Sequence, residues 1–261
     1  WHAQLAQADF QGVSPASLCG VDIYHSSYYP IPPAVRQQAR CKSVLTVHDI
    51  IPILHPEWCG MLGQGPHRYF HPEFNLPATL ATITPDTWLI CPSQATRDDL
   101  CQHLGQQIDP DKVQVIPWAA AALFHPCTDA TQAQAVQSRY RLPDGPYLLS
   151  LCTLEPRKNL DALLRSFHQL LQQEKLPDVH LVLAGPLGWD YQGIFQALEQ
   201  NPDLKERVIF TGYVADGDLA ALYSGALAFV YPSLYEGFGL PPLEAMQCGT
   251  PVVVSGTSSL P

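Results

Sequence analysis

The sequence predicts an α/β protein built from two parallel β-sheets, each assembled from β-α-β units. Short apolar runs alternate with amphipathic segments along the chain, and this pattern is typical of parallel strands that are buried on both faces. Of the 261 residues, 46% are hydrophobic and 15% are charged, a composition that excludes intrinsic disorder. A chain of this length holds one large domain or two ordinary ones.

The apolar runs predict nine strands, four in the first half of the chain and five in the second. The expected strands are residues 21–26, 43–47, 88–91, 113–117, 147–151, 179–184, 208–211, 228–231 and 252–255. After the fourth strand, residues 119–146 contain an alanine-rich turn, a glutamine-rich helix and a proline-rich turn, which indicates an interdomain connection. We therefore expect a boundary near Pro126, with domains at residues 1–126 and 127–261.

Three of the connecting helices have recognisable ends. Ser93 is a suitable N-cap for the helix that follows the third strand. Asn159 is a suitable N-cap for residues 160–171, in which apolar side chains recur at helical spacing. Pro241 suits the first turn of the last helix and Gly249 suits its C-terminal end.

Charge, hydropathy and cysteine usage exclude several classes of protein. The formal net charge is -10, from 24 acidic and 14 basic residues without a Lys/Arg cluster, which disfavours a nucleic-acid backbone binder. The longest apolar runs, residues 147–154 and 227–231, are far shorter than the roughly 20 residues that span a bilayer. The eight cysteines form no C-x-x-C pair, which favours buried thiols in a reducing cytosol over disulfides or zinc.

Both ends of the chain look cut, so we expect a piece of a longer protein with both domains incomplete. Four strands are few for one doubly wound sheet, and the sequence stops directly after its ninth expected strand. The sequence begins at Trp1 and shows no charged head before an apolar core, so no signal peptide is expected.

The most informative stretch is the loop between the eighth strand and the last helix, residues 236–239. It lies at the carboxyl end of its strand, where open α/β sheets bind ligands. Its glycines allow a phosphate to approach the N–H groups at the helix start. Glu236 in the loop and Glu244 in the first helical turn can accept hydrogen bonds from sugar hydroxyls. The alternative is that Glu244 merely favours a helix N-terminus and Glu236 is a solvated loop residue.

A basic pair, Arg157 and Lys158, stands directly before the helix at residues 160–171. Cations at this end oppose the helix dipole, which makes them poor structural choices and good ligands of a diphosphate. A solvated pair is the alternative. The scarcity of Lys and Arg in this chain favours the functional interpretation.

The first half offers weaker candidates at the carboxyl ends of its strands. His48 and Asp49 follow the second strand, and a histidine that merely ends a strand is an equally good explanation. His25 closes the first strand, and Tyr28 and Tyr29 follow it with rings that can stack on a sugar.

In the second half, the loop at residues 185–189 and the segment with Tyr213 and Val214 could frame a nucleotide base, although turn chemistry explains both equally well. Other chemistries lack their signals. The sequence contains no G-x-G-x-x-G, no P-loop, no G-x-S-x-G and no H-E-x-x-H motif, and its histidines show no metal-ligand spacing.

These residues carry a family likeness. Residues 236–244, EGFGLPPLE, resemble the E-x7-E motif of group 1 retaining GT-B glycosyltransferases. Residues 154–159, LEPRKN, are similar to the diphosphate loop of mannosyltransferase-like bacterial polysaccharide enzymes in that group. The likeness extends to residues 46–49, 91–100 and 115–117, and thus covers nearly the whole chain.

The resemblance implies a GT-B fold, in which two Rossmann-like domains with parallel sheets face each other across a cleft. It implies transfer of a hexose, with mannose as one candidate, from a nucleotide diphosphate sugar to a glycan or lipid-linked acceptor. Retention of configuration and a preference for a GDP sugar come from the family alone. It implies no metal, because the basic pair and the helix dipole stabilise the departing nucleoside diphosphate. It also implies a cytoplasmic enzyme and leaves peripheral contact with the inner face of the membrane open.

The family's residue roles carry over onto matching positions. Glu236 would contact the donor sugar and His48 would reach it from the first domain, which makes these two the expected catalytic residues. His25 and Tyr28 would lie on the acceptor side. The expected donor-binding residues are Arg157 and Lys158 for the diphosphate, Glu244 for the ribose, Tyr213 and Val214 near the base, and Gly237, Phe238, Gly239 and Leu240 around the phosphates and sugar.

Two departures from the family keep an alternative open. Many relatives have glycine and arginine where this chain has Cys152 and Thr153, so phosphate binding would depend on Arg157 and Lys158. The family's opening strand and closing helices lack counterparts here, which leaves a truncated, non-catalytic binder of a nucleotide or partner protein as the second hypothesis. Epimerase and phosphorylase chemistry is disfavoured, because neither a nicotinamide loop nor a cofactor lysine site is visible. In the full-length protein, Glu236→Ala or Lys158→Ala is expected to abolish transfer and leave the fold intact.

Overall fold

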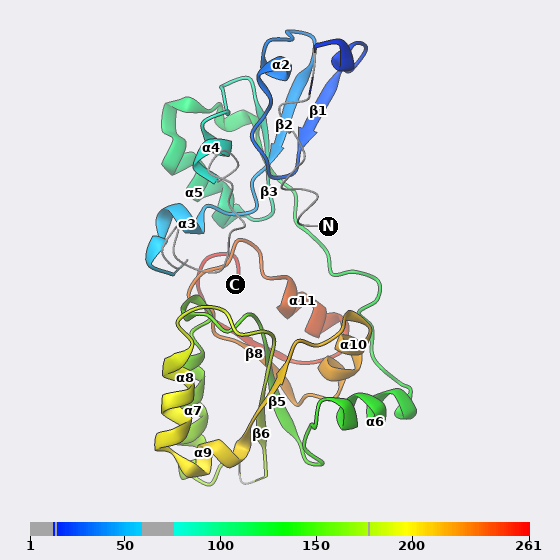
Figure 1. Ribbon diagram of the computed structural model, residues 1–261, viewed down its shortest axis with the longest axis vertical. Coiled ribbons are helices and arrows are strands. Elements are labelled where there is room, and N and C mark those ends of the chain that lie inside the picture. The colour runs from blue at the N-terminus through cyan, green and yellow to red at the C-terminus, as the bar shows by residue number, and fades with distance from the viewer. Residues whose placement is uncertain (1–12, 14, 59–75, 177) are drawn as a thin grey trace. The chain divides into compact units, whose positions relative to one another are not determined.

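The computed structural model describes residues 13, 15–58, 76–176 and 178–261, which form two compact units divided between Pro117 and Trp118 (Figure 1). The boundary expected near Pro126 lies beyond this division, because the segment that follows Trp118 packs on the second unit. The ring of Phe124 meets that of Tyr223 edge to face, with centroids 6.0 Å apart. The connection therefore belongs to the core of the second unit.

The first unit is a four-stranded parallel sheet in the order β1-β2-β3-β4. Its elements in chain order are η1 (Pro15–Leu18), β1 (Ile23–Ser26), α2 (Pro33–Arg36), β2 (Lys42–Thr46), α3 (Ile51–Leu54), η2 (Pro56–Trp58), α4 (Leu76–Leu80), β3 (Trp88–Cys91), α5 (Gln94–Leu104), η3 (Gly105–Gln107), η4 (Pro110–Lys112) and β4 (Val113–Val115).

The two faces of the first sheet differ in burial. Leu45, Leu89 and Val113 lie in register on one face and are buried in the core of this unit. Ile23 and Trp88 belong to the opposite face and are 64% and 41% exposed. Right-handed connections between strands in sequential order all cross the same face, which explains why the described helices of this unit cover one face and leave Ile23 and Trp88 exposed on the other.

The second unit is a five-stranded parallel sheet in the order β7-β6-β5-β8-β9. Its elements are α6 (Ala130–Arg139), β5 (Tyr147–Leu151), η5 (Pro156–Lys158), α7 (Leu160–Gln172), β6 (His180–Ala184), α8 (Gln192–Gln200), α9 (Pro202–Arg207), β7 (Val208–Gly212), α10 (Asp216–Ser224), β8 (Ala228–Tyr231), α11 (Leu240–Gln247) and β9 (Val252–Val254).

This second sheet is covered on both faces. The consecutive β6 residues Leu181, Val182, Leu183 and Ala184 are all buried, and consecutive residues of a strand point to opposite faces. The α/β class and all nine expected strands are therefore confirmed, with ends that differ by at most two residues.

Two helix starts differ from expectation. Asn159 precedes α7, but its backbone is left-handed, with φ of 54°, and its side chain donates to the Pro232 carbonyl (3.2 Å) instead of capping the helix. Helix α11 begins at Leu240, which places Glu244 in the second turn rather than the first. The Ser93 cap is confirmed, because its hydroxyl accepts a hydrogen bond from the Thr96 N–H at 3.1 Å.

The expectation of buried thiols holds only in part, because Cys19 is exposed and Cys101 and Cys127 are of intermediate exposure. The described thiols are free, and those of Cys41, Cys91, Cys152 and Cys248 are buried. Within the same part of the chain, we find no helix with the length and apolar character that a membrane crossing requires.

Candidate active site

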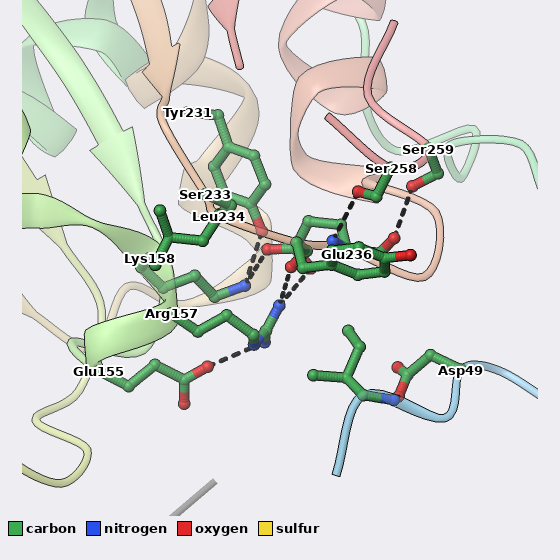
Figure 2. A network of polar contacts seen from close by, with 12 residues as sticks. Asp49, Glu155, Arg157, Lys158, Tyr231, Ser233, Leu234, Glu236, Ser258 and Ser259 are labelled. Atoms are coloured by element: carbon green, nitrogen blue, oxygen red, sulfur yellow. Dashed lines mark hydrogen bonds and ion pairs between the residues drawn. The ribbon is translucent and has the colours of Figure 1, made fainter. Parts of the chain in front are cut away.

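The candidate site lies at the carboxyl ends of β5 and β8, which are neighbours in the second sheet (Figure 2). Two loops form it, residues 152–159 after β5 and residues 232–239 after β8. The Leu234 N–H donates to the Arg157 carbonyl at 2.9 Å, and the Asn159 side chain reaches the Pro232 carbonyl. These bonds hold together two loops that are far apart in the sequence.

The loop after β5 is fixed from its other side by the loop after β6. The Cys152 N–H donates to Ala184 and the Leu154 N–H donates to Pro186, at 2.9 and 3.0 Å, so the ladder between β5 and β6 continues past the strand ends. Gly185 has a φ of +126°, and a Cβ there would lie 1.9 Å from the Cys152 carbonyl oxygen. Only glycine fits this position, because both the backbone conformation and the close approach exclude a side chain.

Two cations and two carboxylates form a continuous ion-pair cluster in this site. Glu236 lies between the cations, with Oε1 2.6 Å from Lys158 Nζ and Oε2 2.7 Å from Arg157 Nη1 (Figure 2). Arg157 Nη2 is 2.8 Å from Glu155 Oε1. The side chains of Lys158, Glu236, Arg157 and Glu155 are only 10%, 11%, 17% and 6% exposed. The cluster is therefore shielded from solvent, and its formal charges balance.

Neutral groups complete the cluster. Lys158 Nζ donates to the Tyr231 hydroxyl, and Arg157 Nη1 donates to the Tyr235 carbonyl, both at 2.8 Å. The backbone of Glu236 is held by the segment after β9, because its N–H donates to Ser258 Oγ and its carbonyl accepts from Ser259 Oγ, both at 2.9 Å. The main chain of Glu236 is thus fixed independently of its carboxylate.

The two carboxylates of the cluster have pKa values shifted in opposite directions. Burial raises the pKa of Glu236, but the Lys158 and Arg157 charges outweigh it and hold that pKa below its ordinary value. Burial also raises the pKa of Glu155, and the Arg157 and Lys158 charges only partly offset it, so that pKa lies above its ordinary value. The pKa values of the two carboxylates differ because Glu236 contacts both cations, whereas Glu155 contacts only Arg157.

The pKa of Glu236 predicts a specific loss of stability in acid. Because the folded-state pKa is depressed, its contribution is present above the ordinary glutamate pKa of about 4.3 and is lost as the pH falls through the folded-state pKa. We expect urea unfolding to show that wild type is more stable than Glu236→Gln at neutral pH. This difference in the free energy of unfolding should narrow as the pH falls below about 4.3. A difference that stays constant down to about pH 3 would contradict this assignment.

Glu244 was expected in the first turn of a helix, but its carboxylate contacts the side chain of Tyr223. Its Oε2 accepts a hydrogen bond from the hydroxyl of buried Tyr223 at 2.9 Å. Burial raises its pKa, and the Tyr223 hydrogen bond only partly offsets this. Glu244 is therefore a partly buried acceptor whose side chain is oriented by Tyr223.

The glycine-rich loop is compact. Gly237 is buried, and the ring of Phe238 meets that of Trp118 edge to face with centroids 5.7 Å apart. Gly239 has a φ of +99°, and a Cβ there would lie 2.8 Å from Leu260 Cδ2. Leu240, the first residue of α11, is partly buried.

The structure separates the two residues expected near a base. Tyr213, directly after β7, is 70% exposed and available to a ligand. Val214 is buried in the core of the second unit, so its side chain is unavailable. Any contact of Val214 with a base would have to come from its backbone.

In the first unit, the two residues expected on the acceptor side, His25 and Tyr28, have different partners. His25 Nε2 lies 2.8 Å from Thr46 Oγ1 on the neighbouring strand. The ring of Tyr28 stacks on that of His48 with centroids 6.2 Å apart. These side chains share the carboxyl ends of β1 and β2.

Sequence reasoning missed three contributors to the ion-pair cluster. Glu155 was passed over although it stands two residues before Arg157, and an acid beside a basic pair is a usable signal. Tyr231 ends a strand, and Ser258 lies in the last few residues; neither position carries a signal in the sequence. In the described part of the chain, no three His, Cys, Asp or Glu side chains gather as a metal site would require.

Two family models match the chain, one for each unit. The model described as "Glycosyl transferases group 1" matches residues 133–261. The model described as "Glycosyltransferase Family 4" matches residues 13–119.

Similar proteins point the same way. O-antigen chain mannosyltransferase B of Escherichia coli is 33% identical over 239 residues, which are 92% of this chain and 58% of that protein. O-antigen chain mannosyltransferase RfbU of Salmonella typhimurium is 36% identical over 212 residues, 81% of this chain and 51% of that protein. The chain thus spans about half the length of these relatives.

Solved structures share the fold. Sucrose-phosphate synthase from Thermosynechococcus elongatus matches 96% of this chain and 60% of its own, with a TM-score of 0.68 and 23% identity. Anabaena HepE in complex with UDP-glucose matches 98% of this chain and 65% of its own, with a TM-score of 0.68 and 21% identity.

Proposed function

We propose that the chain is part of an enzyme that moves a hexose from a nucleotide diphosphate sugar to a glycan or lipid-linked acceptor. The family models described as "Glycosyl transferases group 1" and "Glycosyltransferase Family 4", which match residues 133–261 and 13–119, support this proposal. The observation that carries this proposal is the buried cluster of Lys158, Arg157 and Glu236 at the carboxyl ends of adjacent strands. Mannose is the proposed hexose, because two of the relatives are named mannosyltransferases.

The proposed donor site uses the groups of the second unit. Lys158 and Arg157 bind the diphosphate, since buried cations form strong charge-assisted hydrogen bonds with phosphate oxygens. Glu236 accepts hydrogen bonds from the donor sugar and Glu244 from the ribose. Exposed Tyr213 supplies a ring for the base. His48, His25 and Tyr28 of the first unit are assigned to the sugar and the acceptor.

The proposed chemistry needs no metal. Negative charge develops on the nucleoside diphosphate as the glycosidic bond breaks, and preorganised cations in a site shielded from solvent stabilise it. Lys158 and Arg157 are such cations, and both precede the N-terminus of α7, whose dipole adds to their effect. Retention of the anomeric configuration is part of the proposal on the family's precedent.

Nucleotide binding tests the donor site directly. We expect calorimetry of the purified chain with GDP, UDP, dTDP and ADP to show selective binding of one of them. Glu244→Gln is expected to weaken that binding by about tenfold, since a hydrogen bond to a charged group is worth roughly 1.5–3 kcal/mol. Glu199→Gln, on the exposed surface of α8, is the matched control and should bind like wild type. A cooperatively folded chain that binds none of the four would contradict the proposal.

Transfer from the matching sugar nucleotide separates the two candidate functions. The second candidate is a relative that binds a nucleotide or partner protein without turnover. Release of hexose to an acceptor or to water supports the enzyme. Nucleotide binding without turnover, also in the complete reading frame, supports the second candidate.

A further inference from the structure

The ion-pair cluster already satisfies the two cations that are proposed to bind a diphosphate. Lys158 and Arg157 each contact Glu236, and Arg157 also contacts Glu155. The formal charges of the two cations and the two carboxylates therefore balance. The site is preassembled, and its anionic positions are filled by the protein itself.

An incoming diphosphate would upset this balance. A phosphate group carries about 1.5 to 2 negative charges at neutral pH. With both carboxylates still in place, the two cations would face the charges of two carboxylates and of the diphosphate in a shielded site. Close like charges at such a site cost several kcal/mol. At least one carboxylate must therefore leave the cations or lose its charge.

The contacts distinguish which carboxylate can leave. Glu236 makes its contacts to Lys158 and Arg157 with its side chain alone, while Ser258 and Ser259 hold its main chain. Rotation about its side-chain bonds would therefore free both cations while the main-chain bonds to Ser258 and Ser259 stay in place. Its two oxygens also occupy the positions nearest to both cations.

Glu155 is placed differently. It is 6% exposed, and it contacts the other terminal nitrogen of Arg157, Nη2. Its carbonyl accepts the Lys158 N–H at 3.0 Å, and its Cβ lies 3.4 Å from where a Cβ on Gly188 would be. Because Glu155 contacts Nη2 and Glu236 contacts Nη1, Glu155 can hold the Arg157 guanidinium while Nη1 changes partner.

We propose that Glu236 is an internal counter-ion which the donor's diphosphate displaces from Lys158 and Arg157, while Glu155 is a positioning residue that keeps the Arg157 guanidinium in place. The inference rests on the proposed function, because it concerns the same donor site. It explains how a carboxylate can lie against phosphate-binding cations in the free protein and reach the sugar hydroxyls in the complex. One side chain then couples arrival of the diphosphate to contact with the sugar.

Binding of sugar-free ligands tests the displacement without the confounding sugar contact. The probes are inorganic pyrophosphate and the nucleoside diphosphate that binds wild type best. Glu236→Gln removes the competing charge and is expected to bind both about tenfold more tightly, since relief of one close like-charge contact is worth more than the roughly 1.4 kcal/mol that a tenfold change requires. Glu199→Gln should leave both affinities unchanged.

The positioning role of Glu155 has its own variants. Glu155→Ala removes the acceptor that holds Arg157 Nη2 and is expected to weaken pyrophosphate binding by about tenfold. Glu155→Gln keeps an acceptor oxygen and should restore affinity to the wild-type level or above. Equal losses in both variants would overturn the positioning role, because a mere loss of packing would not be rescued by glutamine.

A measurement on wild type tests the displacement even if a variant fails to fold. Carboxyl NMR titration should show that the pKa of Glu236 rises toward its ordinary value when pyrophosphate saturates the site, because the carboxylate has lost its cation partners. A pKa that stays depressed overturns the displacement. The displacement is also overturned if Glu236→Gln binds the probes no more tightly than wild type. Neither of these two outcomes contradicts the proposed donor site. If neither wild type nor Glu236→Gln binds any of the probes, the inference and the proposed function fall together.

Discussion

Lys158→Met is expected to destabilise the second unit by about 3 kcal/mol, because it leaves buried Glu236 with one cation instead of two. The side chain of Lys158 is buried, and it donates to Tyr231 as well as to Glu236. From the sequence, Lys158→Ala was expected to remove function and leave the fold intact. The burial of this lysine changes that expectation, so loss of activity in such a variant must be read together with its stability.

The measurement is urea unfolding followed by a probe in the second unit. Lys205→Met, an exposed lysine of α9, is the matched control and should change the free energy of unfolding by less than about 0.5 kcal/mol. The double variant Lys158→Met/Glu236→Gln should recover part of the loss, because the unpaired charge is gone. A single variant as stable as the Lys205 control would show that the ion pair contributes little.

Gly185→Ala is expected to destabilise the second unit by about 3 kcal/mol or more, from backbone strain and overpacking together. The φ of +126° is unfavourable for alanine, and its Cβ would lie 1.9 Å from the Cys152 carbonyl oxygen. This atom belongs to the backbone and cannot rotate away. The loop that carries Arg157 and Lys158 would have to shift, so nucleotide binding should fall with stability.

Gly217→Ala provides the control for this substitution. Gly217 lies in α10, and a Cβ there would meet nothing within 4 Å. The variant should be within about 1 kcal/mol of wild type, with a tendency to greater stability. The two alanine variants are compared by thermal unfolding and by their binding of GDP, UDP, dTDP and ADP. Equal stability of both would mean that the loops after β5 and β6 can separate at little cost.

Much of the fold could be predicted because it depends on local patterns. The nine strands are short apolar runs between turns, and their order along the chain follows from the β-α alternation. The loops that carry Arg157, Lys158 and Glu236 could be located because they follow such strands. Tyr213 and Val214 could not be told apart, since burial after a strand end depends on packing from other segments.

The contacts of Glu236 with the two cations could not be predicted, because these residues are distant in the sequence. Lys158 and Glu236 are 78 positions apart, and only the adjacency of β5 and β8 brings them into contact. The same adjacency draws the Asn159 side chain to Pro232 and away from the helix that it was expected to cap. The pairing of β5 with β8 therefore determines the contacts of Asn159 and Lys158, which local sequence preferences do not specify.

The unequal covering of the two sheets has a consequence for how the chain unfolds. Within the described residues, Ile23 and Trp88 are exposed on one face of the first sheet, whereas Leu181 and Val182 are buried on opposite faces of the second. Buried apolar area sets the free energy of local opening, and thinly covered elements open first. The amides of β1 and β3 should therefore exchange their hydrogens with solvent before those of β5 and β6. The half of the chain that holds the ion-pair cluster would remain folded after the other half has opened, and stability measurements on the site should follow this later transition.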